Sequence, residues 1–410
     1  MKKRFYILLC LIPISMFIYS ISFYTIDKFD PIVFYSIDKS EEFSSQTELS
    51  ETYNASTVKP KMQVVFLLDA TGSMSGLIGA AKDKIWSITS SLTQTDPAPE
   101  IEVGMIFYRD RGDQFVTKVI PLSTDLDDLY EKLMAINAAG GGDSPESVNQ
   151  ALYEGVNDIQ WDDKKSTYKT IFLVGDCPPH MDYKDDVKYP ESCSLANGKG
   201  IIVNTILMGN DPTASRIWKE IASKTNGEYI QTDMNVNNIV VRTPYDDRIN
   251  QLQYDLDKTR LYYGESSALM EVKEVQSSKM SKGDAAVNAR RAEYNLSVAG
   301  RSSYYGTNEL LNDVIGGKKL SEIPKSELPD NLQKMSQTEL QKYVDEQINK
   351  RKELEKELAE LSKKRQTHID SELEKMDDEQ VAGSFDNVVF KAVQTQAQTK
   401  EIKIVGKAKR

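Results

Sequence analysis

Hydrophobic positions between residues 61 and 235 fall into short, nearly continuous runs separated by stretches with helical spacing. Residues 62–68 form the clearest run, and an uninterrupted apolar run is typical of a strand covered on both faces of a sheet. Further strands are predicted at residues 101–108, 115–120, 170–174, 201–208 and 229–230. Helices are predicted at residues 77–92, 126–136, 145–159 and 213–225. This alternation predicts an α/β domain over residues 61–235, with a doubly wound, mostly parallel, Rossmann-like sheet.

The pattern changes after residue 235, where strand signals fade and a mainly helical region is predicted over residues 236–380. Within it, the highly charged residues 337–376 carry apolar positions three and four apart, which predicts one apolar stripe on a long helix. Arg365 and a gap between the apolar positions 348 and 354 interrupt the stripe, so it does not establish a long coiled coil. The helix either packs on its own domain or binds a partner. Residues 381–410 are predicted to be a tail, with strand-like runs at 388–390 and 402–404.

The N-terminus carries an apolar run over residues 5–26, preceded by three basic residues. A run of about 20 apolar residues is long enough to span a bilayer as a helix, and the basic flank predicts that the remainder is exported. We therefore expect residues 1–27 to be a single-pass signal anchor in the inner membrane. Residues 28–60 would form a polar stalk that presents the bulk of the chain in the periplasm. The alternative is secretion after cleavage of a signal peptide, although no small-x-small cleavage site follows the run.

Composition narrows the function classes. The chain has 410 residues, of which 28% are charged, too many for a multi-span membrane protein. A net charge of −11 argues against nucleic-acid binding, which draws on clustered Lys and Arg, and is compatible with cation binding. No pattern in the sequence indicates an oligomeric state. Cys177 and Cys193 would form a disulfide in an oxidising compartment, and two free thiols are the alternative.

Oxygen-bearing side chains follow the first predicted strand directly. The strand ends at Asp69, and the loop after it supplies Thr71, Ser73 and Ser75 before the next helix. In open α/β sheets, ligands bind outside the carboxyl ends of the strands. Carboxylate and hydroxyl oxygens suit hard cations such as Mg²⁺ or Ca²⁺, so we expect a metal site in this loop.

Two more loops supply acids that would reach the same crevice. A glycine-rich loop contains Asp143 and Glu146, and Asp176 directly follows the strand at 170–174. Each acid has a simpler explanation: Asp143 as a helix cap, Glu146 as its capping-box partner, and Asp176 as a turn residue. Their positions after successive elements of an α/β domain favour convergence with Asp69.

The sequence Asp69-x-Thr71-x-Ser73 resembles the metal-ion-dependent adhesion site (MIDAS) of von Willebrand factor A (VWA) domains, and the similarity covers residues 61–235. The resemblance implies that Asp69 and Ser73 are direct ligands and that Thr71 takes the second hydroxyl position. Thr71 stands where many members have serine, a change that retains the hydroxyl. The implied metal is Mg²⁺, with Ca²⁺ or Mn²⁺ as alternatives.

The glycine-rich loop indicates which VWA domains this sequence resembles more closely. Its Asp-Ser-Pro-Glu sequence is similar to that of the VWA-like domains in integrin beta polypeptides, and to that of a bacterial, extracytoplasmic subgroup of VWA domains. The likeness implies that Glu146 is a MIDAS ligand and that Asp143 belongs to a second metal site. It places Asp110 as another acid of that second site and Asp176 as the acid of the third metal loop.

We expect an interaction module rather than an enzyme. Its metal would keep one open coordination position, which a protein partner would complete with a carboxylate. A scaffold of an envelope complex, with a structural metal and the helical region as its interaction surface, is the alternative. Catalysis finds little support: Thr71 stands where a Mg²⁺-dependent phosphatase needs a second Asp, no P-loop is present, and the histidines are limited to His180 and His368. We expect a structural role for His180, and interpret the Arg-Gly-Asp at 111–113 as a turn.

Overall fold

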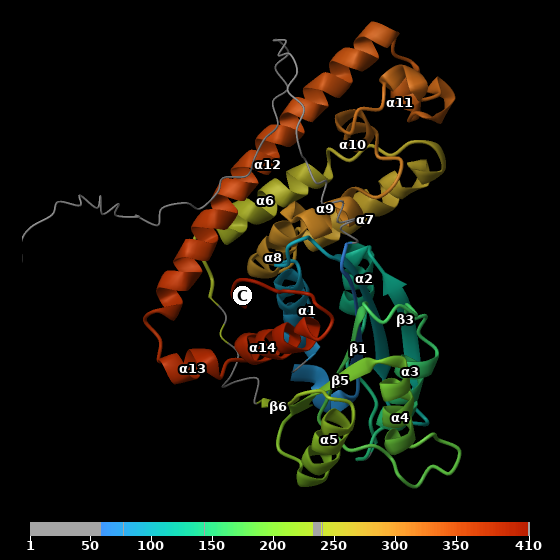
Figure 1. Ribbon diagram of the computed structural model, residues 1–410. Helices are drawn as coiled ribbons and strands as arrows, with labels where there is room; N and C mark the ends of the chain where they lie inside the picture. Colours follow the sequence, from blue (N-terminus) through green and yellow to red (C-terminus); the bar gives the residue numbers. More distant parts are fainter. Residues whose placement is uncertain (1–58, 77, 143, 233–238, 240, 409–410) are drawn as a thin grey trace, which may run out of the picture. The chain divides into compact units, whose positions relative to one another are not determined.

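The computed structural model describes residues 59–76, 78–142, 144–232, 239 and 241–408 and contains a six-stranded sheet (Figure 1). Its strand order is β3-β2-β1-β4-β5-β6, and every neighbouring pair is parallel except the antiparallel β2 and β3. This confirms the predicted doubly wound α/β fold. The strands are β1 (Lys61–Asp69), β2 (Glu100–Tyr108), β3 (Thr117–Ser123), β4 (Tyr168–Gly175), β5 (Ile201–Met208) and β6 (Tyr229–Thr232).

Helices cover both faces of the sheet. Alternate residues of β1 point to opposite faces, so they pack against different helices. Phe66 and Leu68 belong to the core that includes α1 and α2 residues, whereas Val65 and Leu67 belong to the core with α3, α4 and α5 residues. The nearly continuous apolar run of β1 follows from this two-sided burial. These helices are α1 (Ile78–Leu92), α2 (Leu126–Met134), α3 (Val148–Asn157), α4 (Tyr189–Lys199) and α5 (Pro212–Lys224).

The remaining described chain is mainly helical. It comprises α6 (Asp246–Asp257), α7 (Leu269–Met280), α8 (Ala285–Leu296), α9 (Val298–Tyr305), α10 (Leu310–Ile315), α11 (Asp330–Gln333), α12 (Gln337–Leu373), α13 (Asp378–Ala382) and α14 (Phe385–Gln398). Short 3₁₀ turns occur at η1 (Gly72–Gly76), η2 (Gly264–Ala268), η3 (Leu320–Glu322) and η4 (Lys325–Glu327). A C-terminal helical region was predicted, and the structure confirms it.

The long helix α12 packs on its own helices. Its apolar stripe joins buried clusters with residues of α6, α8 and α10. Arg351 and Arg365, which break the apolar pattern, are fully buried as well. Arg351 forms a two-pronged ion pair with Glu309, at 2.8 and 2.9 Å, and Arg365 pairs with Asp246 at 2.8 Å. Both arginines therefore hold α12 against the rest of the helical region. Of the two alternatives, the helix packs on its own domain.

The end of the chain returns to the sheet. Figure 1 shows α14 beside α1, and Phe385, Val389 and Val393 of α14 belong to the same core as Phe66 of β1. The strand expected at 388–390 is wrong, because these residues lie within α14. The buried Phe385, Val389 and Val393 repeat at the four-residue spacing of a helix. The helical region thus lies in the sequence between β6 and a helix that covers the same sheet.

Two other expectations are corrected. Among the helices of the described residues, none combines the length and apolar character needed to cross a bilayer. This finding contradicts the predicted single-pass membrane location: α12 has 37 residues but carries charged side chains along its whole length. The expected span at 1–27, and the stalk up to residue 58, lie outside the described residues. The favoured disulfide is also wrong, because Cys177 and Cys193 are both free thiols.

Candidate metal centre

The loop after β1 is folded around one carboxylate. Asp69 is the last residue of β1 and only 1% exposed. Its Oδ1 accepts hydrogen bonds from the Thr71 amide at 2.8 Å and the Thr71 hydroxyl at 2.6 Å. The Thr71 and Ser73 hydroxyl oxygens lie 3.1 Å apart. The second Asp69 oxygen, Oδ2, is buried and accepts no hydrogen bond from the described residues, so the loop holds Asp69 in place and leaves one of its oxygens available.

Asp176 joins this site from the neighbouring strand. β1 and β4 pair in parallel with Leu68 opposite Val174, which brings the loop after β4 next to Asp69. A Cβ atom on Gly175 would lie 3.0 Å from Asp69 Oδ2 and 2.3 Å from the Tyr108 hydroxyl oxygen. Glycine is therefore required at this close approach. The Oδ1 atom of Asp176 is also buried, and no described residue donates a hydrogen bond to it.

Glu146 approaches from the glycine-rich loop. It lies before α3, which begins at Val148, so the simpler capping-box explanation is wrong. Glu146 is 2% exposed, and its Oε2 is buried without a hydrogen-bond partner among the described residues. A Cβ atom on Gly141 would lie 3.0 Å from both Glu146 Oε1 and Thr71 Cβ, which places Glu146 beside the Asp69 loop. Asp143, the other acid of this loop, lies outside the described residues.

Two of these carboxylates, Asp69 and Glu146, have a raised pKa. Burial raises the pKa of Asp69 to about 7, and the charge of Asp176 adds to this while hydrogen bonds from Thr71 oppose it. Burial also raises the pKa of Glu146 to about 8, with contributions from Asp69, Asp110, Asp113 and Asp176. Burial and like charge both disfavour the ionised carboxylate. A positive charge among these oxygens would remove that penalty.

The oxygen donors are of mixed type. Among the described residues, no group of three or more His, Cys, Asp or Glu side chains is arranged to hold a metal ion by itself. The hydroxyls of Thr71 and Ser73 must therefore be counted with the carboxylates of Asp69, Glu146 and Asp176. Carboxylate and hydroxyl oxygens of this kind are the donors taken by hard divalent cations, which also retain water ligands.

Asp110 differs from the other acids because protein donors already surround it. Its carboxylate accepts hydrogen bonds from Ser147 Oγ at 2.9 Å and from Tyr183 Oη at 3.0 Å. His180 Nε2 lies 3.4 Å from Asp110 Oδ2, and the His180 ring stacks on Tyr183 with centroids 4.0 Å apart. Asp110 is thereby held beside the site, and its assignment to a second metal stays a prediction.

Asp113 organises the glycine-rich loop, which the sequence interpretation missed. Its Oδ2 accepts hydrogen bonds from the amides of Asp110, at 3.2 Å, and Gly141, at 3.0 Å. Gly140 and Gly141 have φ angles of 80° and 74°, and a Cβ atom on Gly140 would lie 2.2 Å from Asp113 Oδ1. The consecutive glycines were the sequence signal for this contact. A loop of glycines leaves its backbone amides open to a carboxylate that lies close enough to accept their hydrogen bonds.

Arg109 joins the two loops without neutralising the acids. Its Nε donates to the Ala70 carbonyl at 3.0 Å, and its Nη2 donates to the Asn137 carbonyl at 2.7 Å. The guanidinium also lies 4.3 Å from the Phe115 ring centroid. These partners are neutral, so Arg109 holds the backbone around the site and does not neutralise its acids. Asp69 and Glu146 form no ion pair with any described residue.

Comparison with known proteins agrees with this architecture. Residues 63–235 match the family model of the von Willebrand factor A domain. These residues form a VWA domain, a class that generally mediates protein–protein interactions, often with a metal. The match ends before α14, which nevertheless packs on the same sheet.

Two curated proteins have similar sequences. A putative ariadne-like RING finger protein of Acanthamoeba polyphaga mimivirus is 22% identical over 200 residues, covering 44% of this chain and 19% of that protein. Von Willebrand factor A domain-containing protein 7 of Rattus norvegicus is 33% identical over 95 residues, covering 23% of this chain and 10% of that protein. The chain thus matches less than a fifth of either relative.

Solved structures with partial similarity include two further proteins. The pilus adhesin SpaC from Lactobacillus rhamnosus GG is 15% identical, with 43% of this chain and 29% of that chain covered and a TM-score of 0.34. Proximal thread matrix protein 1 from the mussel byssus is 14% identical, with 42% of each chain covered and a TM-score of 0.33.

Proposed function

We propose that the carboxyl edge of the sheet binds one divalent cation, Mg²⁺ in preference to Ca²⁺ or Mn²⁺, and that the cation in turn binds a carboxylate of a protein partner. Asp69, Thr71, Ser73, Glu146 and Asp176 would hold the cation. The cation supplies positive charge and an open coordination position that a partner's Asp or Glu can fill. The protein binds and does not catalyse in this proposal.

The observation that carries the proposal is the set of three buried carboxylate oxygens without hydrogen-bond donors among the described residues. Asp69 Oδ2 lies at the end of β1, Glu146 Oε2 in the glycine-rich loop before α3 and Asp176 Oδ1 in the loop after β4. Buried polar atoms in proteins are normally satisfied, and buried carboxylates are normally paired. Three unsatisfied oxygens at the same edge are therefore best explained by a ligand that carries positive charge.

The surrounding residues support a preorganised site. Thr71 fixes one oxygen of Asp69, and Asp113 fixes the glycine-rich loop beside Glu146. These groups would rearrange little when a cation binds. Little free energy would then be spent on ordering the site, which favours tight binding of the cation and of the partner. The integrin-beta-like arrangement, in which Asp143 and Asp110 serve a second metal, is a further part of the proposal.

The proposal is tested by capturing partners on the full-length protein with Mg²⁺ present. We expect partner proteins from an extract of the cells that express it to bind in Mg²⁺ and to elute with chelator. Asp69→Asn, which keeps the shape of the side chain, should abolish capture. Glu353→Gln, which removes one exposed acid from α12, is the matched control and should bind as the unmodified protein does.

A partner set that resists chelation and persists in Asp69→Asn would contradict the proposal. If that set were lost on deleting residues 330–380, the helical region would be the interaction surface, and the metal, if bound, would be structural. Thermal unfolding of each variant distinguishes loss of binding from loss of fold.

A further inference from the structure

A pocket lies at the edge of the sheet opposite the acidic site. It has a volume of about 550 Å³, within the range typical of small-molecule sites, roughly 300–1,000 Å³. It is formed where β4 and β5 begin, by the loop before β4, the turn between α4 and β5, and the residues after α14. Parallel strands place their amino ends together, so the pocket is separated from the metal site by the length of the strands.

The pocket is lined by four lysines from separate segments. Lys169, the second residue of β4, is only 6% exposed. Lys165 comes from the preceding loop, Lys199 ends α4, and Lys400 follows α14. Among the described residues, no ion pair within 4.0 Å joins any of these ammonium groups to a carboxylate; Lys169 donates to the Asp162 carbonyl and Lys199 to the Val156 carbonyl.

The charge of the pocket is positive in an acidic protein. Two aspartates, Asp162 and Asp163, also line it, so four lysines and two aspartates leave a net charge of +2. Burial lowers the pKa of Lys169, and the neighbouring charge of Lys400 lowers it further. An anion bound between these lysines would relieve both effects.

We propose that this pocket binds a phosphate-bearing small molecule. A phosphate monoester carries about −1.5 to −2 charges at pH 7, which matches the net charge of the pocket. The ammonium groups are donors without acceptor capacity and suit phosphate oxygens. Trp161 and Ile159 give the pocket an apolar wall on which an organic group can pack. The same site would take inorganic phosphate with lower affinity.

The test is calorimetric titration of the full-length protein with inorganic phosphate and with adenosine 5′-monophosphate. The buffer contains chelator, so that phosphate cannot bind through a cation at the opposite edge. We expect at least one probe to bind. The double variant Lys165→Gln/Lys400→Gln, which changes side chains with no hydrogen bond or ion pair among the described contacts, should weaken binding about tenfold or more. Stronger binding of the nucleotide would identify the phosphate as part of an organic ligand.

The control is Lys352→Gln/Lys356→Gln, which removes the same charge from the exposed surface of α12. Equal weakening by this control would overturn the proposal, because binding would then reflect net charge alone. Lack of binding of both probes to the unmodified protein would also overturn it. Lys169→Met supplies a second test: it should abolish binding while thermal unfolding shows the fold is retained.

Discussion

Two groups of buried acids in this protein have pKa values that are shifted in opposite directions. At the carboxyl edge of the sheet, burial raises the pKa of Asp69 to about 7 and that of Glu146 to about 8. Between α2, α6 and α8, burial acts on Asp127 and Asp257 in the same direction, but the charges of neighbouring arginines outweigh it, and both pKa values are lowered. Similar burial therefore gives opposite outcomes, depending on whether the chain supplies a counter-ion.

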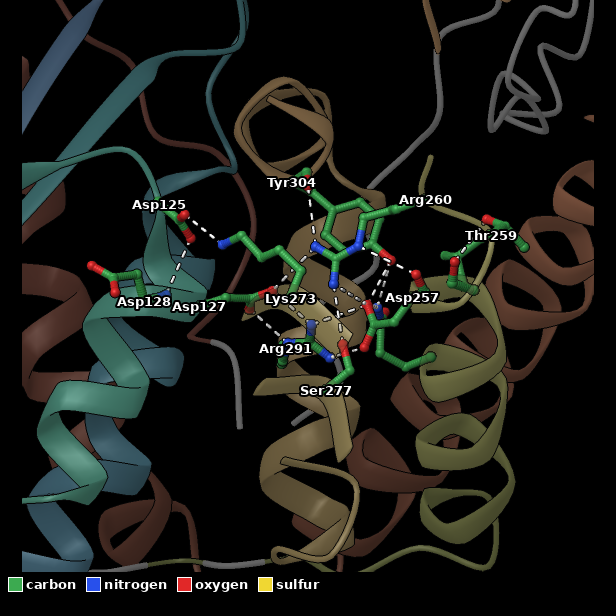
Figure 2. Close-up of polar contacts among 12 residues, drawn as sticks. Asp125, Asp127, Asp128, Asp257, Thr259, Arg260, Lys273, Ser277, Arg291 and Tyr304 are labelled. Atoms are coloured by element: carbon green, nitrogen blue, oxygen red, sulfur yellow. Dashed lines mark hydrogen bonds and ion pairs between the residues drawn. The ribbon is translucent and has the colours of Figure 1, made fainter. Parts of the chain in front are cut away.

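Figure 2 shows how completely the second group is paired. Arg291 donates to both oxygens of Asp127, at 2.7 and 2.6 Å, and to both oxygens of Asp257, each at 3.1 Å. Tyr304 donates to Asp257 at 2.7 Å, and Arg260 lies 3.3 Å from the same carboxylate. This network joins α2 of the VWA domain to the helical region, so it is a structural link between the two.

The two groups differ in whether the chain supplies a counter-ion for each buried carboxylate. The network contains its own cations and needs nothing from outside. The acidic site contains three carboxylates whose free oxygens have no donor in the described residues. Arg109 lies beside the acidic site but donates to backbone carbonyls, and no described residue forms an ion pair with Asp69 or Glu146. An external cation is what we propose for this site.

The largest expected effect follows from breaking the network. Arg291→Met should lower the free energy of unfolding by about 3–5 kcal/mol, because it leaves Asp127 and Asp257 buried with too few counter-ions. Urea denaturation measures the change. Arg248→Met removes an exposed pair with Glu357 and should cost less than about 1 kcal/mol. Similar losses for the two variants would remove the distinction between the two kinds of pair.

The acidic site should respond in the opposite way. Glu146→Gln removes a charge that burial and like-charged neighbours disfavour, so at pH 8 without metal it should stabilise the protein by roughly 1–3 kcal/mol. The same variant should lose the stabilisation that Mg²⁺ gives the unmodified protein. Destabilisation of the metal-free form, with the response to Mg²⁺ intact, would show that Glu146 has a structural role.

The stability of the metal-free protein should depend on pH in a characteristic direction. Asp69 and Glu146 have ordinary values of 3.8 and 4.5 and folded pKa values of about 7 and 8. Between these limits the folded state binds more protons than the unfolded state, so stability falls as pH rises from about 4 to 8. Mg²⁺ should flatten the slope, because it competes with protons for the same oxygens. A stability that rises over this window would contradict the raised pKa values.

The smallest effect concerns the glycine-rich loop. Gly141→Ala and Gly112→Ala both place a side chain at positive φ and should each cost about 1 kcal/mol. Only the Cβ atom at Gly141 meets Glu146 and Thr71, whereas the Cβ atom at Gly112 meets open space. We expect Gly141→Ala alone to weaken Mg²⁺ binding in a titration. Equal affinities in the two variants would separate the loop from the metal site.

The sequence predicted the parts of this protein that local patterns determine. The apolar run of β1 and the acid at its end reflect burial on two faces and the fixed position of strand ends. Glu146 and Asp176 are predicted as site residues because they follow elements whose order along the chain is clear from the pattern, and the structure brings both close to the Asp69 loop.

The parts that the sequence did not predict depend on distant partners. Arg351 and Arg365 interrupted an apolar stripe, but each is buried because an acid 42 or 119 residues away neutralises it. The sequence predicted a tail with strand-like runs where α14 lies, because the sheet that α14 covers precedes it by the whole helical region. Asp113 was interpreted as a turn residue because its partner, the Gly141 amide, lies 28 residues further on.

Calorimetric titration with Mg²⁺ at pH 8 measures whether Asp69, Glu146 and Asp176 bind an external divalent cation, as we propose. The full-length protein, stripped with chelator, should bind Mg²⁺ at a site that Asp69→Asn and Glu146→Gln each abolish and that Glu353→Gln leaves unchanged. Identical titrations of the unmodified protein and the two site variants, whether they show binding or none, would contradict the proposed metal site.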